Sequence, residues 1–137
     1  MSKIIKINES SNRAVGIFIE RKFEIAPIRK VTVFFEGVNF LMTPYNTDNG
    51  VTFVAEGDGQ IHAHSLNCGY GGSGPSATFA VLKNLGISEE KASIAFQSRG
   101  FSIDLADNFI TRDLDFFRYS DDTHEKRMPV FDFNEFL

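Results

Sequence analysis

Residues 51–85, VTFVAEGDGQIHAHSLNCGYGGSGPSATFAVLKNL, decide the fold, because the spacing of their apolar residues changes part-way along. The runs 51–55 and 60–64 alternate around Gly57-Asp58-Gly59, a pattern typical of a β-hairpin that puts His62 and His64 on one face. From residue 76 to 85 the spacing becomes helical, and Gly86 follows where a C-terminal cap favours glycine. The stretch therefore predicts a hairpin, a glycine-rich connection and a helix.

A second helix is predicted directly after the first. Ser88 is a natural N-cap, two acidic residues follow it in the first turn, and the helix would end near Gly100. Other predicted elements are strands before the hairpin, at 14–19 and 31–35, and strands or ordered loops after Asp104, at 109–110, 116–117 and 130–137. We therefore expect a single α+β domain over residues 1–137, mainly an antiparallel sheet packed against a helical hairpin of residues 76–99.

The composition indicates a packed cytoplasmic protein. Apolar residues make up 42% of the 137 residues, which is too many for a disordered chain. No apolar run approaches the roughly 18 residues that cross a bilayer, and the N-terminus lacks the continuous apolar core of a signal peptide. The single cysteine, Cys68, excludes an intrachain disulfide. We expect a cytoplasmic location and no membrane partner.

Charge is spread unevenly along the chain. The net charge of −4 argues against general nucleic-acid binding. Residues 1–103 hold ten Lys and Arg against nine Asp and Glu, whereas residues 104–137 hold four against nine. This acidic, Phe-rich C-terminal segment is either a solvated face or a surface that docks on a protein partner, including a second subunit of a homo-oligomer.

The glycine-rich segment, residues 69–75, carries the strongest functional signal. Four glycines in six residues let the backbone approach a ligand closely, and successive free amides can hold an anion. Pro75 suits the first helical position, so the amides of the helix start would join the site. Phosphate is the anion that fits best. The residues predicted to bind it are Tyr70, Gly71, Gly72, Ser73, Gly74 and Ser76, with Tyr70 stacking on a base.

The segment matches neither of the common phosphate-binding motifs. No Gly-Lys-Ser/Thr follows it, as a P-loop requires, and its glycines do not space as G-x-G-x-x-G. The alternative interpretation is a tight turn whose glycines permit close packing of the helix on the sheet. Both interpretations stay open at the level of the sequence.

The run Gly-Tyr-Gly-Gly-Ser-Gly-Pro at residues 69–75, before an Ala- and Leu-rich helix, resembles the core of an uncharacterised family of small bacterial and phage proteins. The resemblance covers roughly residues 50–100. That family has Trp where this chain has Cys68, and Ala where it has Ser76. The resemblance implies a shared fold element and a mobile-element context, and it implies no activity.

Other candidate residues lie outside the segment. Lys83 and Arg99 could neutralise phosphate charge, and the H-x-H pair His62 and His64 could line the same pocket. That pair can also chelate a metal, but no third ligand is evident, so we predict no metal and no cofactor. Cys68 is interpreted as a small buried residue, with a histidine-activated nucleophile as the alternative.

These observations give one leading hypothesis and one alternative. The leading hypothesis is non-enzymatic binding of a phosphorylated small molecule, such as a nucleotide-type signal. Phage anti-defence by sequestration of a host immune nucleotide is one version, which rests on the resemblance. The alternative is a structural or protein-interaction module that acts through residues 104–137, with the glycine-rich segment only a turn.

Overall fold

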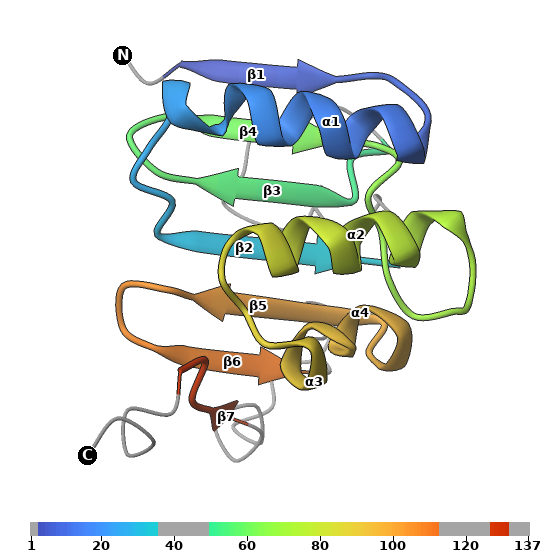
Figure 1. Ribbon diagram of the computed structural model, residues 1–137, viewed down its shortest axis with the longest axis vertical. Helices are drawn as coiled ribbons and strands as arrows, with labels where there is room; N and C mark the ends of the chain where they lie inside the picture. Colours follow the sequence, from blue (N-terminus) through green and yellow to red (C-terminus); the bar gives the residue numbers. More distant parts are fainter. Residues whose placement is uncertain (1–2, 36–49, 113–126, 132–137) are drawn as a thin grey trace.

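The computed structural model describes residues 3–35, 50–112 and 127–131. In these ranges the strands form one sheet in the order β1-β4-β3-β2-β5-β6-β7. β1 runs parallel to β4, and every other neighbouring pair is antiparallel (Figure 1). The strands are β1 (Ile4–Ile7), β2 (Lys30–Phe34), β3 (Phe53–Glu56), β4 (Gln60–Ala63), β5 (Gly100–Asp104), β6 (Phe109–Arg112) and β7 (Arg127–Met128).

The α-helices all lie on the same face of the sheet (Figure 1). α1 lies in front of β1 and β4, α2 in front of β2, and the short α3 and α4 in front of β5 and β6. The fold is thus α+β, with a mainly antiparallel sheet. The helical elements are α1 (Ser11–Arg21), the 3-10 helix η1 (Lys22–Glu24), α2 (Ser73–Asn84), α3 (Glu89–Ala92) and α4 (Ile94–Gln97).

The predicted strand at 14–19 is wrong, because these residues form the middle of α1. Ala14 and Phe18, four residues apart, are fully buried, while Gly16 and Ile19 are exposed. A strand would have buried alternate residues instead. Phe18 anchors the helix by meeting the Phe53 ring edge-on, with centroids 5.6 Å apart. A six-residue apolar run fits either element, and tertiary packing selects the helix.

The other predicted elements exist with shifted bounds. The hairpin of β3 and β4 around Gly57-Asp58-Gly59 and the strand β2 are confirmed. The first helix of the pair begins three residues early, at Ser73. The second is split into α3 and α4 at Ser93, and the Ser88 side chain caps it by accepting from the Lys91 amide at 3.3 Å. Residues 116–117 and 132–137 lie outside the described residues.

The core lies between the sheet and the helices. The register aligns one apolar residue from each of six strands across the sheet, and all are buried. The row is Ile5, Ile61, Ala55, Val31, Ile103 and Ile110. β5 is not among the predicted elements, because Gly100 is assigned to the end of a helix. Phe101 and Ile103 nevertheless alternate with Ser102 and Asp104 as in a strand.

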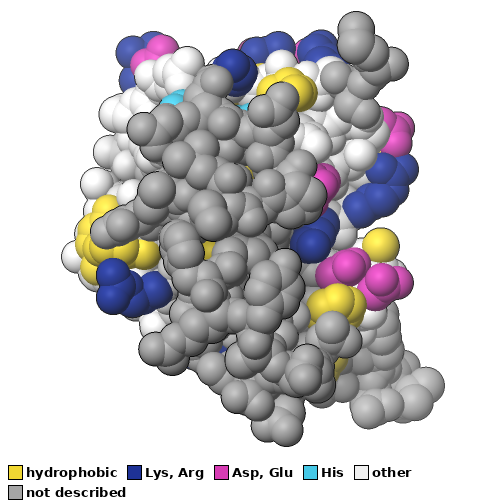
Figure 2. Space-filling model, turned by 180° about the vertical axis from the view of Figure 1, so that it is seen from behind, with side chains coloured by type: hydrophobic (Ala, Val, Ile, Leu, Met, Phe, Trp, Pro, Cys, Tyr) yellow, Lys and Arg dark blue, Asp and Glu magenta, His cyan; other side chains and the backbone are white. Residues whose placement is uncertain are grey.

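The opposite face of the sheet carries a polar row. His62, Thr32 and Ser102 occupy aligned positions on β4, β2 and β5 and are buried, with Val54 of β3 as the apolar member of the row between His62 and Thr32. Seen from that side, charged side chains of both signs lie near one another along the margins of the molecule (Figure 2). Among the described residues, none of the helices is long and apolar enough to cross a membrane.

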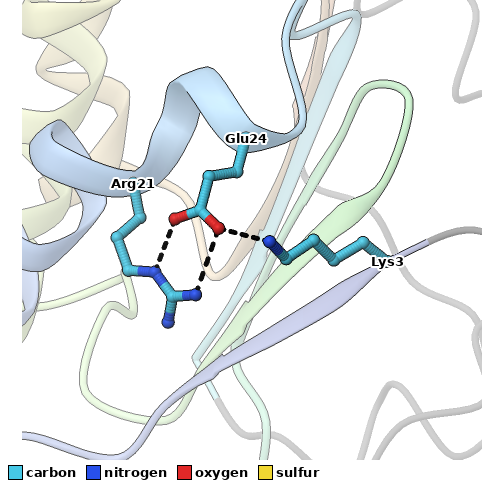
Figure 3. A network of polar contacts seen from close by, with 3 residues as sticks. All are labelled: Lys3, Arg21 and Glu24. Atoms are coloured by element: carbon cyan, nitrogen blue, oxygen red, sulfur yellow. Dashed lines mark hydrogen bonds and ion pairs between the residues drawn. The ribbon is translucent and has the colours of Figure 1, made fainter.

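A three-residue polar network ties the N-terminal strand to the end of α1 (Figure 3). The Glu24 carboxylate accepts from Arg21 Nε at 2.7 Å and also from Lys3 Nζ, just before β1. The hydrogen bond from Arg21 and then that from Lys3 lower the pKa of Glu24 from 4.5 to about 2. The network therefore favours the charged carboxylate in the folded state.

Candidate functional site

The glycine-rich segment connects β4 to α2 and is anchored at its base by hydrogen bonds. The Gly69 amide donates to Ala95 O at 2.9 Å, which fixes the segment to α4. The Thr78 hydroxyl lies 2.7 Å from Asn67 O and 3.1 Å from Gly74 O, so it joins the segment to the first turn of α2. Thr78 is therefore an internal anchor and not a ligand group.

The start of α2 leaves backbone donors unused. Gly72 is the N-cap, and its carbonyl accepts from the Ser76 amide at 3.0 Å. Within the part of the chain that the structure describes, the amides of Gly71, Gly72, Ser73 and Gly74 donate to no protein acceptor. Ser73 and Ser76 are exposed, so their hydroxyls face solvent beside these amides. Free donors at a helix N-terminus suit an anion.

Packing explains three of the four glycines. Gly69 has a φ of +96°, which favours glycine, and lies against Arg99 and Phe35. A Cβ on Gly72 would lie 2.6 Å from Tyr70 Cε2, and one on Gly74 would lie 1.9 Å from Asn67 Oδ1. The Tyr70 ring therefore folds back over the segment. A Cβ on Gly71, by contrast, would meet nothing within 4 Å.

An aromatic and cationic ladder lies beside the segment. Arg99 Cζ is 4.5 Å from the Phe35 ring centroid, and Phe35 meets Tyr70 edge-on at 5.7 Å. Tyr70 is 39% exposed and Arg99 is exposed, so both remain accessible to a ligand. Within residues 3–35, 50–112 and 127–131, Arg99 forms no ion pair with a carboxylate. A free positive charge is thus held next to the unused amides.

At this edge of the molecule, on the right in Figure 1 and the left in Figure 2, hydrophobic side chains lie beside Lys or Arg. The structure therefore gathers seven of the predicted ligand-binding residues at one end of α2. They are Tyr70, Gly71, Gly72, Ser73, Gly74, Ser76 and Arg99.

The other three predicted residues lie elsewhere. Lys83 is in the last turn of α2, about 15 Å along the helix from its start, with its Nζ 5.5 Å from the Phe79 ring centroid. His62 belongs to the sheet face away from the helices, where its Nε2 is 2.7 Å from Gln60 Oε1. His64 lies against Gly50, and the described residues show no hydrogen bond between its ring and the segment.

Cys68 is unsuited to nucleophilic catalysis. The side chain is fully buried, and burial raises the pKa of its thiol to about 12. The reactive thiolate is therefore scarce at neutral pH. Among the described residues, no group of three or more His, Cys, Asp or Glu side chains is placed to hold a metal ion.

Two residues of this region were missed at the level of the sequence. Phe35, directly after β2, lies between Arg99 and Tyr70 and contacts both. Asn67 places its buried Oδ1 against Gly74, and among the described residues this oxygen has no hydrogen-bond partner. Phe35 closes a predicted strand and Asn67 precedes the glycines, but no sequence pattern links either residue to a site.

Comparison of the chain with known proteins adds no function: no family model, no curated protein and no solved structure matches it.

Proposed function

We propose that this chain binds a phosphorylated small molecule of the nucleotide type at the N-terminus of α2, without catalysing a reaction. The observation that carries the proposal concerns the described residues, among which the amides of residues 71–74 donate to no protein acceptor and Arg99, beside the segment, forms no ion pair with a carboxylate. Amides at a helix start attract negative charge through hydrogen bonds and through the helix dipole. Arg99 adds a full positive charge and a planar fork that matches phosphate oxygens.

The aromatic ladder supports a ligand that also carries a base. Tyr70 and Phe35 lie next to the donors, and base–aromatic stacking contributes roughly 1–3 kcal/mol per base. The phosphate of a nucleotide would thus bind the amide and guanidinium donors, and its base would stack on the Tyr70 ring. The proposal includes a cytoplasmic location, where nucleotides occur. Its biological role would be to sequester a nucleotide signal.

The test is calorimetric titration with ATP, a cyclic dinucleotide and inorganic phosphate, on the full chain and on two variants. Gly71→Val adds bulk where the free protein has open space, so the fold should persist while close approach of phosphate is blocked. Arg99→Met removes the charge. We expect each variant to weaken nucleotide binding by about tenfold or more, the loss for one charge-assisted contact.

The matched control for Arg99→Met is Lys83→Met, because Lys83 is an exposed cation at the far end of α2. It should bind as the unchanged chain does. The proposal fails if no nucleotide or phosphate binds, or if both Gly71→Val and Arg99→Met bind with unchanged affinity. Gly72→Val is a poor test, because its Cβ would already collide with the Tyr70 ring.

A second candidate function, a structural or protein-interaction module, is favoured by one observation. Tyr70 and Asn67 fill the space above Gly72 and Gly74, as expected of a turn packed on itself. The acidic Phe-rich segment 104–137 that would contact a partner lies largely outside the described residues. If calorimetry detects no ligand and Gly71→Val leaves every property unchanged, this second function is the better account.

A further inference from the structure

A hollow lies at the C-terminal end of α2, opposite the end that carries the glycine-rich segment and on the left in Figure 1. Its volume is about 230 Å³, larger than the roughly 150 Å³ of a cavity that holds one benzene ring. Among the described residues, those that line it are separate from the nucleotide site proposed above. They include Lys22, Phe23, Ile28, Asn84, Leu85 and Leu105.

Hydrogen bonds hold the walls of the hollow in place. The Ile25 amide donates to Lys22 O at 3.1 Å, which closes η1. The Leu105 amide donates to Arg29 O at 2.8 Å, which ties the turn after β5 to the residue before β2. The Lys22 Nζ donates to Asn84 Oδ1 at 2.6 Å and so links η1 to the end of α2. The hollow is therefore formed before a ligand arrives.

Most of the lining is apolar, and one aromatic ring in it is open to solvent. Phe23 is 74% exposed, more than any other large hydrophobic side chain among the described residues. Ile28, Leu85 and Leu105 line the same hollow and are half-buried. A second ring could cover the Phe23 ring, and paired aromatic rings gain affinity beyond the area that they bury. The hollow therefore favours an aromatic ligand.

The same hollow carries one positive charge. Lys22 Nζ lies 5.3 Å from the Phe23 ring centroid, and its bond to Asn84 leaves two other N–H groups for a ligand. Within the described part of the chain, no carboxylate lines the hollow and Lys22 forms no ion pair. Glu24, two residues after Lys22, is held by the network of Figure 3.

The end of α2 does not cancel this charge. A helix C-terminus carries about half a negative elementary charge, located on its unpaired carbonyls. Here the carbonyls of Val81, Leu82 and Lys83 accept hydrogen bonds of 3.0–3.2 Å from amides of residues 85–87. The full charge of Lys22 therefore exceeds the partial charge of the helix end.

We propose that this hollow binds a small aromatic acid, with its carboxylate on Lys22 and its ring on Phe23 and the aliphatic lining. One cation and no lining carboxylate among the described residues favour a monoanion over a cation or a neutral molecule. The apolar lining favours a ring over inorganic phosphate, which has no apolar surface to bury.

Phenylacetate is the probe, and two analogues are its matched controls. Amide chemical shifts of the full chain are followed by NMR while each compound is added. Phenylacetate should cause saturable shifts around residues 22–28, 84–85 and 105. Phenylacetamide, which lacks the charge, should bind about tenfold more weakly or worse. Cyclohexylacetate, which lacks the aromatic ring, should bind about two- to tenfold more weakly, the range expected for one aromatic pair.

Two variants test the role of Lys22. Lys22→Met should weaken phenylacetate binding by about tenfold or more, as loss of a charge-assisted hydrogen bond predicts. Asn84→Asp keeps the shape of the side chain bonded to Lys22 but neutralises the ammonium, so it should weaken binding to a similar degree. The matched control is Lys83→Met, because Lys83 Nζ also lies near a ring, 5.5 Å from the Phe79 centroid, but outside the hollow. This variant should bind as the unchanged chain does.

The proposal is overturned if phenylacetate gives no saturable shifts, if the shifts fall at residues 69–76, or if either analogue binds as tightly as phenylacetate. It is also overturned if Lys22→Met or Asn84→Asp binds phenylacetate as the unchanged chain does, or if Lys83→Met weakens binding as much as Lys22→Met. Loss of nucleotide binding alone leaves it standing, because the two sites share no residue.

Discussion

The Cys68 thiol lies directly before the glycine-rich segment, yet it has no exposed surface and burial raises its pKa to about 12. The ordinary pKa of a cysteine thiol outside such a buried site is 9.0. At pH 8 the thiolate of Cys68 should therefore be about a thousandfold scarcer in the folded chain than in the unfolded chain. We expect a disulfide reagent to label Cys68 very slowly in buffer and rapidly in urea. Rapid labelling of the folded chain would contradict the buried placement.

Individual residues also show which parts of the candidate site can be predicted from the sequence and which cannot. The run 70–76 could be predicted because its members adjoin in the sequence and share one helix start. Arg99 was one cation among several, and its stacking on Phe35 depends on the pairing of β2 with β5. The alternation along β4 correctly predicts that His62 lies opposite Ile61 and Ala63, but it does not show which face receives the helices, so the expected place of His62 beside the segment is wrong.

At the scale of elements, the β3–β4 hairpin turn is packed against neighbouring backbone. A Cβ on Gly57 would lie 2.0 Å from Ile25 O and 2.5 Å from Pro27 O, and backbone atoms cannot easily move away. Gly57→Ala should therefore reduce the free energy of unfolding by about 1–3 kcal/mol, the usual cost of overpacking. Urea unfolding followed by circular dichroism measures this change.

The matched control for Gly57→Ala is Gly16→Ala, in the exposed middle of α1. A Cβ there meets nothing within 4 Å, so the substitution should raise the free energy of unfolding by about 1 kcal/mol through helix propensity. A loss of stability in Gly16→Ala would argue against a helix at 11–21. Equal effects of the two substitutions would argue against the close packing of the hairpin turn.

The two predicted helices and the hairpin show why some elements could be derived from sequence and α1 could not. The hairpin has its own turn residues, and the second helix has Ser88 as a cap that the structure confirms. In contrast, the side chain of Ser10, the N-cap residue of α1, makes no capping hydrogen bond, and the helix carries Gly16 at an exposed position. The sequence signals for a helix are weak in this stretch, so the packing of Phe18 against Phe53 of the sheet determines that it becomes a helix.

At the scale of the whole molecule, the Lys3–Arg21–Glu24 network makes stability depend on pH. The folded pKa of Glu24 is about 2 and its ordinary value is 4.5. A lowered carboxyl pKa stabilises the fold above the ordinary value, and this contribution is lost as pH falls from about 4.5 toward 2. The melting temperature of Glu24→Gln should therefore lie below that of the unchanged chain at pH 7, and the gap should close near pH 2.

The control for Glu24→Gln is Asp107→Asn, an exposed carboxylate at which the described residues place no ion pair. Its melting temperature should follow that of the unchanged chain at both pH values. A gap for Glu24→Gln that stays constant with pH would show that the network adds nothing to stability, as happens for many exposed ion pairs.

The parallel pairing of β1 with β4 has a consequence for how the chain is made. Ile4 pairs with Gln60, so β1 leaves the ribosome before β4, its partner in the hairpin of β3 and β4, has been synthesised. During synthesis β1 stays unpaired, and its later pairing with β4 closes a long loop, which costs conformational entropy. Docking of β1 is thus a late step of assembly, and its amides should be among the first to exchange with solvent.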